Sequence, residues 1–148
     1  MELVSNLTDL PVMENTRSPS AGRVLVVEDD DLLRDLIVEM LADVGFAASA
    51  ACCADEALQL LKNQCDFVAM VTDVDMPGDL NGIALAAQVN EKWPWIGVVI
   101  TSGAHRGGAL GPRRQAVFLP KPFHADRLAM VVRSVIKAEA APAHRRAS

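Results

Sequence analysis

Acidic side chains follow two apolar runs of this sequence, and their chemistry suits a divalent cation. The run Arg23–Val27, apolar after its first residue, is followed by Glu28 and Asp29. A second apolar run ends at Thr72 and is followed by Asp73. Carboxylates held close together raise one another's pKa, and a hard cation such as Mg²⁺ removes that cost. A carboxylate beside such an ion can attack a phosphoryl group. We therefore predict a Mg²⁺ site with Asp73 as the nucleophile.

Three other polar residues are placed to assist this chemistry. Thr101 and Lys121 each follow an apolar run, and Asp75 comes two residues after the candidate nucleophile. In phosphoryl transfer, negative charge collects on three equatorial oxygens. We expect the Lys121 ammonium, the Thr101 hydroxyl and a backbone N–H near Val74 to meet that charge. The backbone carbonyl of Asp75 would complete the protein ligands of the cation.

Each of these residue types also has an ordinary structural role. An acid after a strand is commonly a turn or helix cap, and we prefer that interpretation for Asp30 and Asp31. A lysine between prolines is commonly a solvated turn residue. A functional role for Lys121 is therefore supported only because its strand should end beside the other site residues. Phe118 is, by default, a core residue. The functional interpretation therefore depends on a fold that brings the strand ends together.

Apolar runs alternate with segments of helical periodicity along the chain. The predicted strands are Arg23–Val27, Phe46–Ala51, Phe67–Thr72, Ile96–Ile100 and Ala116–Leu119. The predicted helices cover Leu32–Leu41, Ala54–Asn63, Ile83–Val89 and His124–Ala140, the third of them capped by Asp79 or Asn81. This alternation predicts an α/β fold with a parallel sheet covered by helices on both faces. With right-handed crossovers, we choose the flavodoxin-like strand order 2-1-3-4-5, which makes strands 1, 3, 4 and 5 neighbours.

Three segments depart from this pattern. Glycine and proline interrupt Ala104–Gln115, so the fourth helix is expected to be short or absent. Residues 1–22 are interpreted as a flexible leader with a short helical turn near Leu3–Leu7, or as a segment that docks on the domain or on a partner. Residues 23–140 form the domain, and residues 141–148 a frayed tail.

Composition excludes several classes of protein. The chain has 148 residues, 51% of them hydrophobic, and a net charge of −5, which argues against a large nucleic-acid interface. No apolar run is long enough to cross a membrane, and the N-terminus lacks a secretory signal. The three cysteines, Cys52, Cys53 and Cys65, show no metal-ligand spacing. We predict reduced, partly buried thiols in a cytoplasmic protein.

Four short segments together resemble the receiver domain of bacterial two-component response regulators. They are Val26–Asp30, Thr72–Gly78, Val99–Gly103 and Leu119–Phe123. The resemblance implies that Asp73 accepts a phosphoryl group from a histidine kinase or a histidine phosphotransfer protein. It also implies Mg²⁺ held by Glu28, Asp29, Asp73 and the carbonyl of Asp75, a switch pair of Thr101 and Phe118, a phosphate contact from Lys121, and a cis Lys121–Pro122 peptide.

The same resemblance sets what we expect of the output. About eight residues follow the last predicted helix, which predicts a single-domain regulator that acts through protein contacts, as a relay intermediate or as a stand-alone effector. Beyond its own phosphorylation and dephosphorylation, no enzyme activity is expected. One alternative is a Mg²⁺-dependent phosphatase, because Asp73-Val74-Asp75 echoes the Asp-x-Asp of haloacid-dehalogenase-like enzymes. Another is a scaffold that is never phosphorylated.

Overall fold

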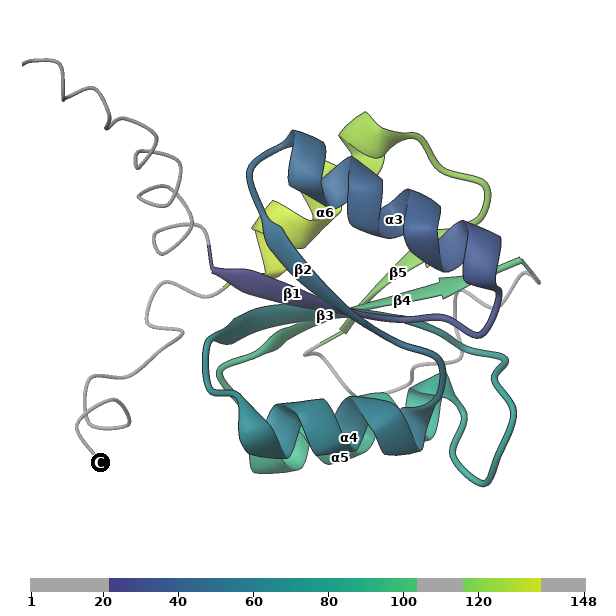
Figure 1. Cartoon of the computed structure of the whole chain (residues 1–148), viewed down its shortest axis with the longest axis vertical. Helices are drawn as coiled ribbons and strands as arrows, with labels where there is room; N and C mark the ends of the chain where they lie inside the picture. The colour runs from purple at the N-terminus through teal and green to yellow at the C-terminus, as the bar shows by residue number, and fades with distance from the viewer. Residues whose placement is uncertain (1–21, 104–115, 137–148) are drawn as a thin grey trace, which may run out of the picture.

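The computed structural model describes residues 22–103 and 116–136, which form one parallel sheet flanked by helices (Figure 1). The strands are β1 Arg23–Val27, β2 Ala47–Ala51, β3 Phe67–Asp73, β4 Gly97–Ser102 and β5 Ala116–Pro120. The helices are α3 Asp31–Asp43, α4 Ala54–Asn63, α5 Gly82–Lys92 and α6 Ala125–Val135. The strand order is β2-β1-β3-β4-β5, which confirms the flavodoxin-like arrangement.

The sheet separates two hydrophobic cores. In Figure 1, α3 and α6 cover one face of the sheet, and α4 and α5 cover the other. Side chains of β1, β3 and β4 alternate between the two cores, so these strands are apolar on both faces. The core under α4 and α5 includes Leu25, Met70, Leu85, Val98 and Ile100. The core under α3 and α6 includes Val26, Ile37, Val71, Val99 and Leu128. This two-sided burial explains the continuous apolar runs of the sequence.

The start of α3 is fixed by a side-chain cap. Asp30 Oδ1 accepts hydrogen bonds from the backbone N–H of Leu32 at 3.0 Å and of Leu33 at 3.1 Å. This confirms the capping role predicted for Asp30 and satisfies donors that the first turn of a helix leaves unpaired. After the helix, Gly45 has a φ of 99°, a left-handed conformation that glycine adopts without strain.

Asn81 caps α5, which settles the choice between Asp79 and Asn81. Its Oδ1 accepts a hydrogen bond from the backbone N–H of Ala84 at 2.9 Å. We expect Asn81→Ala to lower the free energy of unfolding by about 1 kcal/mol, because the first turn loses this acceptor. Asp79→Ala, the matched control on the same exposed loop, should change it by less than about 0.5 kcal/mol. Urea unfolding checks both, and equal losses in the two variants would contradict the assignment.

The last helix is shorter than predicted. We expected helix through Ala140, but α6 ends at Val135, and Ile136 has extended backbone with φ −74° and ψ 123°. The sequence offers no stop signal at this point, since the next proline is Pro142. The predictions for the leader, for Ala104–Gln115 and for the C-terminal tail lie outside the described residues.

The cysteines are more accessible than predicted. Cys52 and Cys65 are exposed and only Cys53 is half-buried, so the expectation of partly buried thiols is wrong for two of the three. All three are free thiols. A hydrogen bond with the Glu56 carboxylate raises the pKa of Cys52 to about 11, which disfavours its reactive thiolate form.

Among the helices of the described ranges, none is long and apolar enough to cross a membrane.

Candidate functional site

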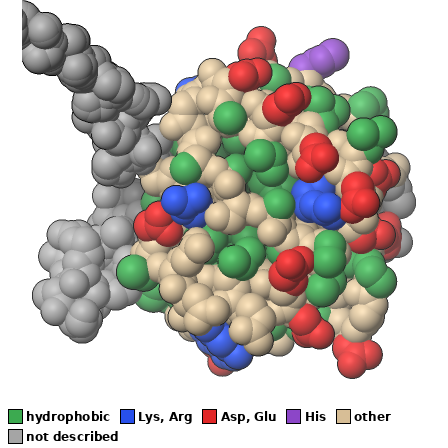
Figure 2. All heavy atoms as spheres, viewed as in Figure 1, with side chains coloured by type: hydrophobic (Ala, Val, Ile, Leu, Met, Phe, Trp, Pro, Cys, Tyr) green, Lys and Arg blue, Asp and Glu red, His purple; other side chains and the backbone are tan. Residues whose placement is uncertain are grey.

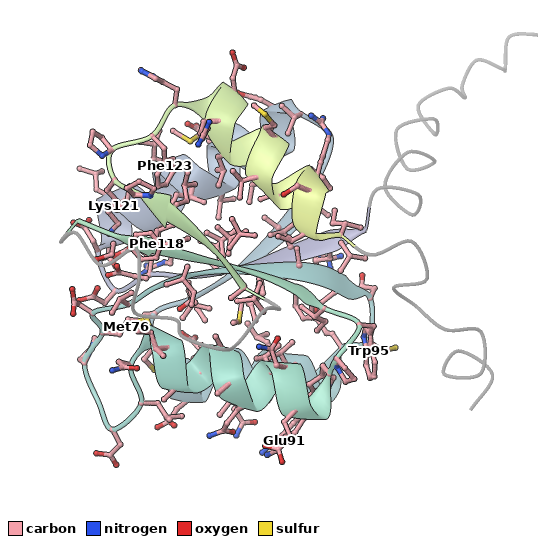
Figure 3. The ribbon with its side chains drawn as sticks, turned by 180° about the vertical axis from the view of Figure 1, so that it is seen from behind. Met76, Glu91, Trp95, Phe118, Lys121 and Phe123 are labelled. Carbon is pink, nitrogen blue, oxygen red and sulfur yellow. The ribbon has the colours of Figure 1, made fainter. Side chains whose placement is uncertain are left out.

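The strands β1, β3, β4 and β5 all end on the same side of the sheet. The residues singled out from the sequence lie at or just after these carboxyl ends. In the β3–β4 register, Asp73 lies directly opposite Thr101. β1 and β3 are aligned so that Val27 pairs with Thr72, which places Glu28 beside Asp73. Figure 3 shows Lys121 and Met76 at this same end of the molecule. The topology therefore turns positions far apart in the sequence into one site.

Three carboxylates converge at this edge. Glu28, Asp29 and Asp73 each offer an oxygen, and these oxygens lie within 4.8 Å of one another. Glu28 is 2% and Asp73 6% exposed, whereas Asp29 faces solvent. Hard oxygen donors with one side open to water are what Mg²⁺ prefers, since it keeps several of its own waters. The donor set therefore fits the predicted cation.

Lys121 bridges two of these carboxylates. Its Nζ lies 3.2 Å from Asp73 Oδ1 and 3.3 Å from Glu28 Oε1. The backbone N–H of Lys121 donates to the carbonyl of Ser102 at 3.0 Å, which holds the residue against the end of β4. The Lys121–Pro122 peptide is cis, as predicted. Lys121 is therefore a member of the site and not a solvated turn residue.

Burial dominates the electrostatics of the site. Desolvation raises the pKa of Asp73, with Lys121 opposing and Asp75 and Asp29 adding to the shift. Desolvation likewise raises the pKa of Glu28, opposed by the Asp30 backbone N–H that donates to Glu28 Oε2 at 3.1 Å. Desolvation is the largest single influence on the pKa of Lys121, and it lowers that pKa. Attraction by Asp73 and Glu28 together outweighs desolvation, so the pKa of Lys121 is also raised. Without a cation, burial thus disfavours the charged forms of both Asp73 and Glu28.

This electrostatic imbalance predicts a pH dependence of stability. Acids with a raised pKa in the folded state bind protons more tightly there than in the unfolded chain. Stability without Mg²⁺ should therefore fall as pH rises from about 4, the ordinary range of Asp and Glu, through the raised values of Asp73 and Glu28. Asp73→Asn should reduce the slope, because one of the two acids no longer titrates. Thermal unfolding from pH 4 to 8 measures this, and an equal or steeper slope in the variant would refute it.

The remaining predicted residues lie around this centre. Thr101 is buried, Asp75 is exposed, and Phe118 is half-buried and packs against the core under α4 and α5. The expectation of a backbone donor near Val74 is narrowed, because the N–H of Val74 itself donates to the carbonyl of Thr101 at 2.9 Å. That bond continues the ladder between β3 and β4, so Val74 N–H is not the donor for a phosphoryl oxygen in this structure.

Arg34 belongs to the site although the sequence did not single it out. Its Nη1 donates to the backbone carbonyl of Glu28 at 2.9 Å, and its Nη2 pairs with Asp31 at 2.7 Å. The guanidinium thus ties the β1–α3 turn, which carries Glu28 and Asp29, to the first turn of α3. The Asp31–Arg34 spacing of three residues on a helix was the available signal. The contact with a main-chain carbonyl carries no such sequence signal.

Acidic residues also surround the site on the surface. In Figure 2, many acidic side chains lie toward the right-hand end and the upper surface, near the start of α3. Asp29, Asp30, Asp31 and Asp35, in or just before the first turns of α3, are all exposed. Surface charge of one sign raises the local concentration of counter-ions, so this rim favours a divalent cation over a free anion.

A doubly wound α/β domain with an acidic pocket and a bridging lysine at the carboxyl edge of its sheet is the class defined so far. The family model for the response regulator receiver domain matches residues 24–133. The chain belongs to this family.

Relatives and solved structures agree with that assignment. The chain is 33% identical over 114 residues to sensor protein TorS of Escherichia coli (strain K12), covering 74% of this chain and 12% of TorS. It is 31% identical over 118 residues to the DNA-binding transcriptional regulator NtrC of the same strain, covering 78% of this chain and 25% of NtrC. The receiver domain of NtrX from Brucella abortus superimposes with a TM-score of 0.71 at 30% identity, covering 78% of this chain and 98% of that domain. The chain thus spans a quarter or less of the length of these curated relatives.

Proposed function

We propose that this protein is the phosphoreceiver of a two-component system or phosphorelay, with Asp73 as the acceptor. The donor is a phosphohistidine on a histidine kinase or a histidine phosphotransfer protein. The observation that carries the proposal is the position of Asp73, buried between two further carboxylates and in contact with the Lys121 ammonium. The site lies at the carboxyl edge of a parallel sheet, where ligands of such folds bind.

The chemistry follows from this arrangement. A carboxylate oxygen of Asp73 attacks phosphorus, a P–O bond forms, and the P–N bond to the donor imidazole breaks. The electron pair of the broken bond stays on the imidazole nitrogen, which then takes up a proton. Charge builds on the equatorial oxygens, and the ammonium of Lys121 is placed to neutralise one of them while it leaves the carboxylate. The hydroxyl of Thr101, across the strand pair from Asp73, serves a second.

Mg²⁺, when bound, would neutralise charge on the phosphoryl oxygens and reduce the repulsion among the acids. Asp29 and Asp73 would hold it directly, Glu28 through a water, and Asp75 through its backbone carbonyl. Arg34 keeps the turn that bears Glu28 in place. The convergence of the Glu28, Asp29 and Asp73 carboxylates supports this ligand set.

Phosphorylation is proposed to signal through protein contacts, with Thr101 and Phe118 as the switch pair. This domain would serve as a relay intermediate or an effector in the cytoplasm, with no nucleic-acid interface of its own and no catalytic turnover beyond its own phosphorylation cycle. The net charge of −5 supports the absence of a nucleic-acid interface.

Beryllofluoride, a mimic of the phosphoryl group, tests the proposal. With Mg²⁺ present, ¹⁹F NMR of the full chain should show a bound, slowly exchanging beryllofluoride signal. Asp29→Asn should weaken Mg²⁺ affinity by about tenfold or more. Removing a residue that only supports a metal ligand already costs about that much, and Asp29 is proposed as a direct ligand. Asp30→Asn is the matched control, because asparagine preserves the α3 cap next to the site. Absence of a bound signal in the parent chain, at saturating Mg²⁺, would leave a scaffold that is never phosphorylated.

A further inference from the structure

A second hollow lies at the opposite end of the sheet, where β3 and β4 begin, far from the acidic pocket. Its volume is about 450 Å³, and it opens between the α4–β3 and α5–β4 connections. Figure 3 shows Trp95, one of its lining residues, at the end of the molecule opposite Lys121. Because it is remote from Asp73, it has no part in the phosphoryl chemistry proposed above.

Five of the nine residues that line this hollow are apolar, and three of those five are aromatic. Its apolar residues are Leu61, Phe67, Trp93, Trp95 and Ile96. Both tryptophans are only half-buried, and they are the two tryptophans of the whole chain. Hollows of this size that combine aromatic walls with a few polar groups are typical of binding sites, and clustered exposed apolar surface commonly marks an interaction.

The chain enters the domain beside this hollow. The backbone N–H of Arg23, the first residue of β1, donates to the carbonyl of Asp66 at 3.2 Å, and its Nε pairs with the Asp66 carboxylate at 3.0 Å. Asp66 lies between Cys65 and Phe67, which both line the hollow. The strand pairing places Arg23 opposite Phe67. The described part of the chain therefore begins next to residues that line the hollow.

The sequence of the leader suits this hollow in shape and charge. Leu3, Leu7 and Leu10 have the i, i+4, i+7 spacing that places side chains on one face of a helix. Residues 1–16 contain three acids and no lysine or arginine. Among the described residues that line the hollow, Lys62 is the charged one. An acidic segment with a leucine stripe thus complements a hollow with apolar walls whose one charged lining residue is Lys62.

We propose that residues 1–16 of this chain dock their leucine stripe in the hollow lined by Trp93 and Trp95. Reach poses no obstacle, because the eleven residues 11–21 can span about 35 Å when extended, whereas neighbouring strands are about 5 Å apart. Docking would remove apolar surface of both partners from water, which is favourable. It would also cover the end of the domain that is remote from phosphorylation.

The C-terminal tail is a poorer occupant. After Ile136 it contains no apolar residue larger than alanine or proline. It also carries Lys137, Arg145 and Arg146, which would repel Lys62. The leader therefore fits better than the other terminal segment of the chain.

Tryptophan fluorescence of the 148-residue chain tests the proposal directly, because both tryptophans line the hollow. In the triple variant Leu3→Ser, Leu7→Ser and Leu10→Ser, we expect red-shifted emission and an acrylamide quenching constant about twofold higher, because the rings lose their apolar cover. The matched control replaces Ser5, Asn6 and Thr8 by alanine, which leaves the leucine stripe intact and should match the parent. Alkylation of Cys65, followed by peptide mass, should speed up in the leucine variant, with Cys52 as the internal reference.

Unchanged quenching and unchanged Cys65 alkylation in the leucine variant would overturn the proposal. Protection of the tryptophans from acrylamide in the parent chain that disappears on dilution would also overturn it, because the occupant would then be a segment of a second copy. A synthetic peptide of residues 1–16 that restores protection to the leucine variant would support it. None of these readouts depends on phosphorylation, so the outcome is independent of the proposed function.

Discussion

Asp73→Asn is expected to abolish the mass gain of one phosphoryl group that acetyl phosphate and Mg²⁺ give to the parent chain. Asparagine keeps the shape of the side chain but replaces the nucleophilic carboxylate oxygen by an amide, whose oxygen is a far poorer nucleophile. The Lys121 ammonium that contacts Asp73 Oδ1 at 3.2 Å keeps Glu28 as a partner, so the variant should stay folded. Intact mass spectrometry of the two proteins, treated side by side, measures the effect.

Asp75→Asn is the matched control, because it removes an acid two residues away without removing the acceptor. It should still gain the phosphoryl group. If the exposed Asp75 carboxylate steers the hydrolytic water, the lifetime of the phosphorylated species should change in this variant, and an unchanged lifetime would refute that role. A mass gain of equal size in Asp73→Asn would place the acceptor elsewhere and contradict the proposed mechanism.

The fold and the centre of the site were predictable because they depend on periodicity and on strand ends. Continuous apolar runs mark β1, β3 and β4, which are buried on both faces, and all five predicted strands lie within about two residues of the observed bounds. Once the order β2-β1-β3-β4-β5 is fixed, the residues after β1, β3 and β5 must meet. Glu28, Asp73 and Lys121 were therefore brought together as expected.

The features that were missed depend on contacts that no local pattern encodes. Arg34 reaches a main-chain carbonyl, and any long donor at the right helical phase could do so. The N–H of Val74 is engaged by β4, which depends on the register between two strands. Cysteine is commonly buried, yet Cys52 and Cys65 lie in connections next to helix ends, where the chain meets solvent. The early end of α6 at Val135 belongs to the same class, since no glycine or proline marks it.

Gly82→Ala is expected to lower the free energy of unfolding by about 3 kcal/mol, the upper part of the range for overpacking. Gly82 is the first residue of α5, and its N–H donates to the carbonyl of Val74 at 2.8 Å. A Cβ at this position would overlap the backbone carbonyl of Asp73 and crowd the Cα of Val74. Main-chain atoms at the end of a buried strand cannot swing aside as a side chain can, so the β3–α5 junction itself must shift.

The sign of this effect separates two physical causes. Helix propensity alone predicts that Gly→Ala stabilises a helix by up to about 1 kcal/mol, so a gain in stability would show that the junction adapts and that our steric argument is wrong. Gly103→Ala is the matched control: a Cβ there meets nothing within 4 Å, and the change should stay within about 0.5 kcal/mol. Urea unfolding without Mg²⁺ compares the three proteins. Because the displaced carbonyl belongs to Asp73, a destabilised Gly82→Ala should also accept the phosphoryl group more slowly, which links the packing of α5 to the chemistry at the end of β3.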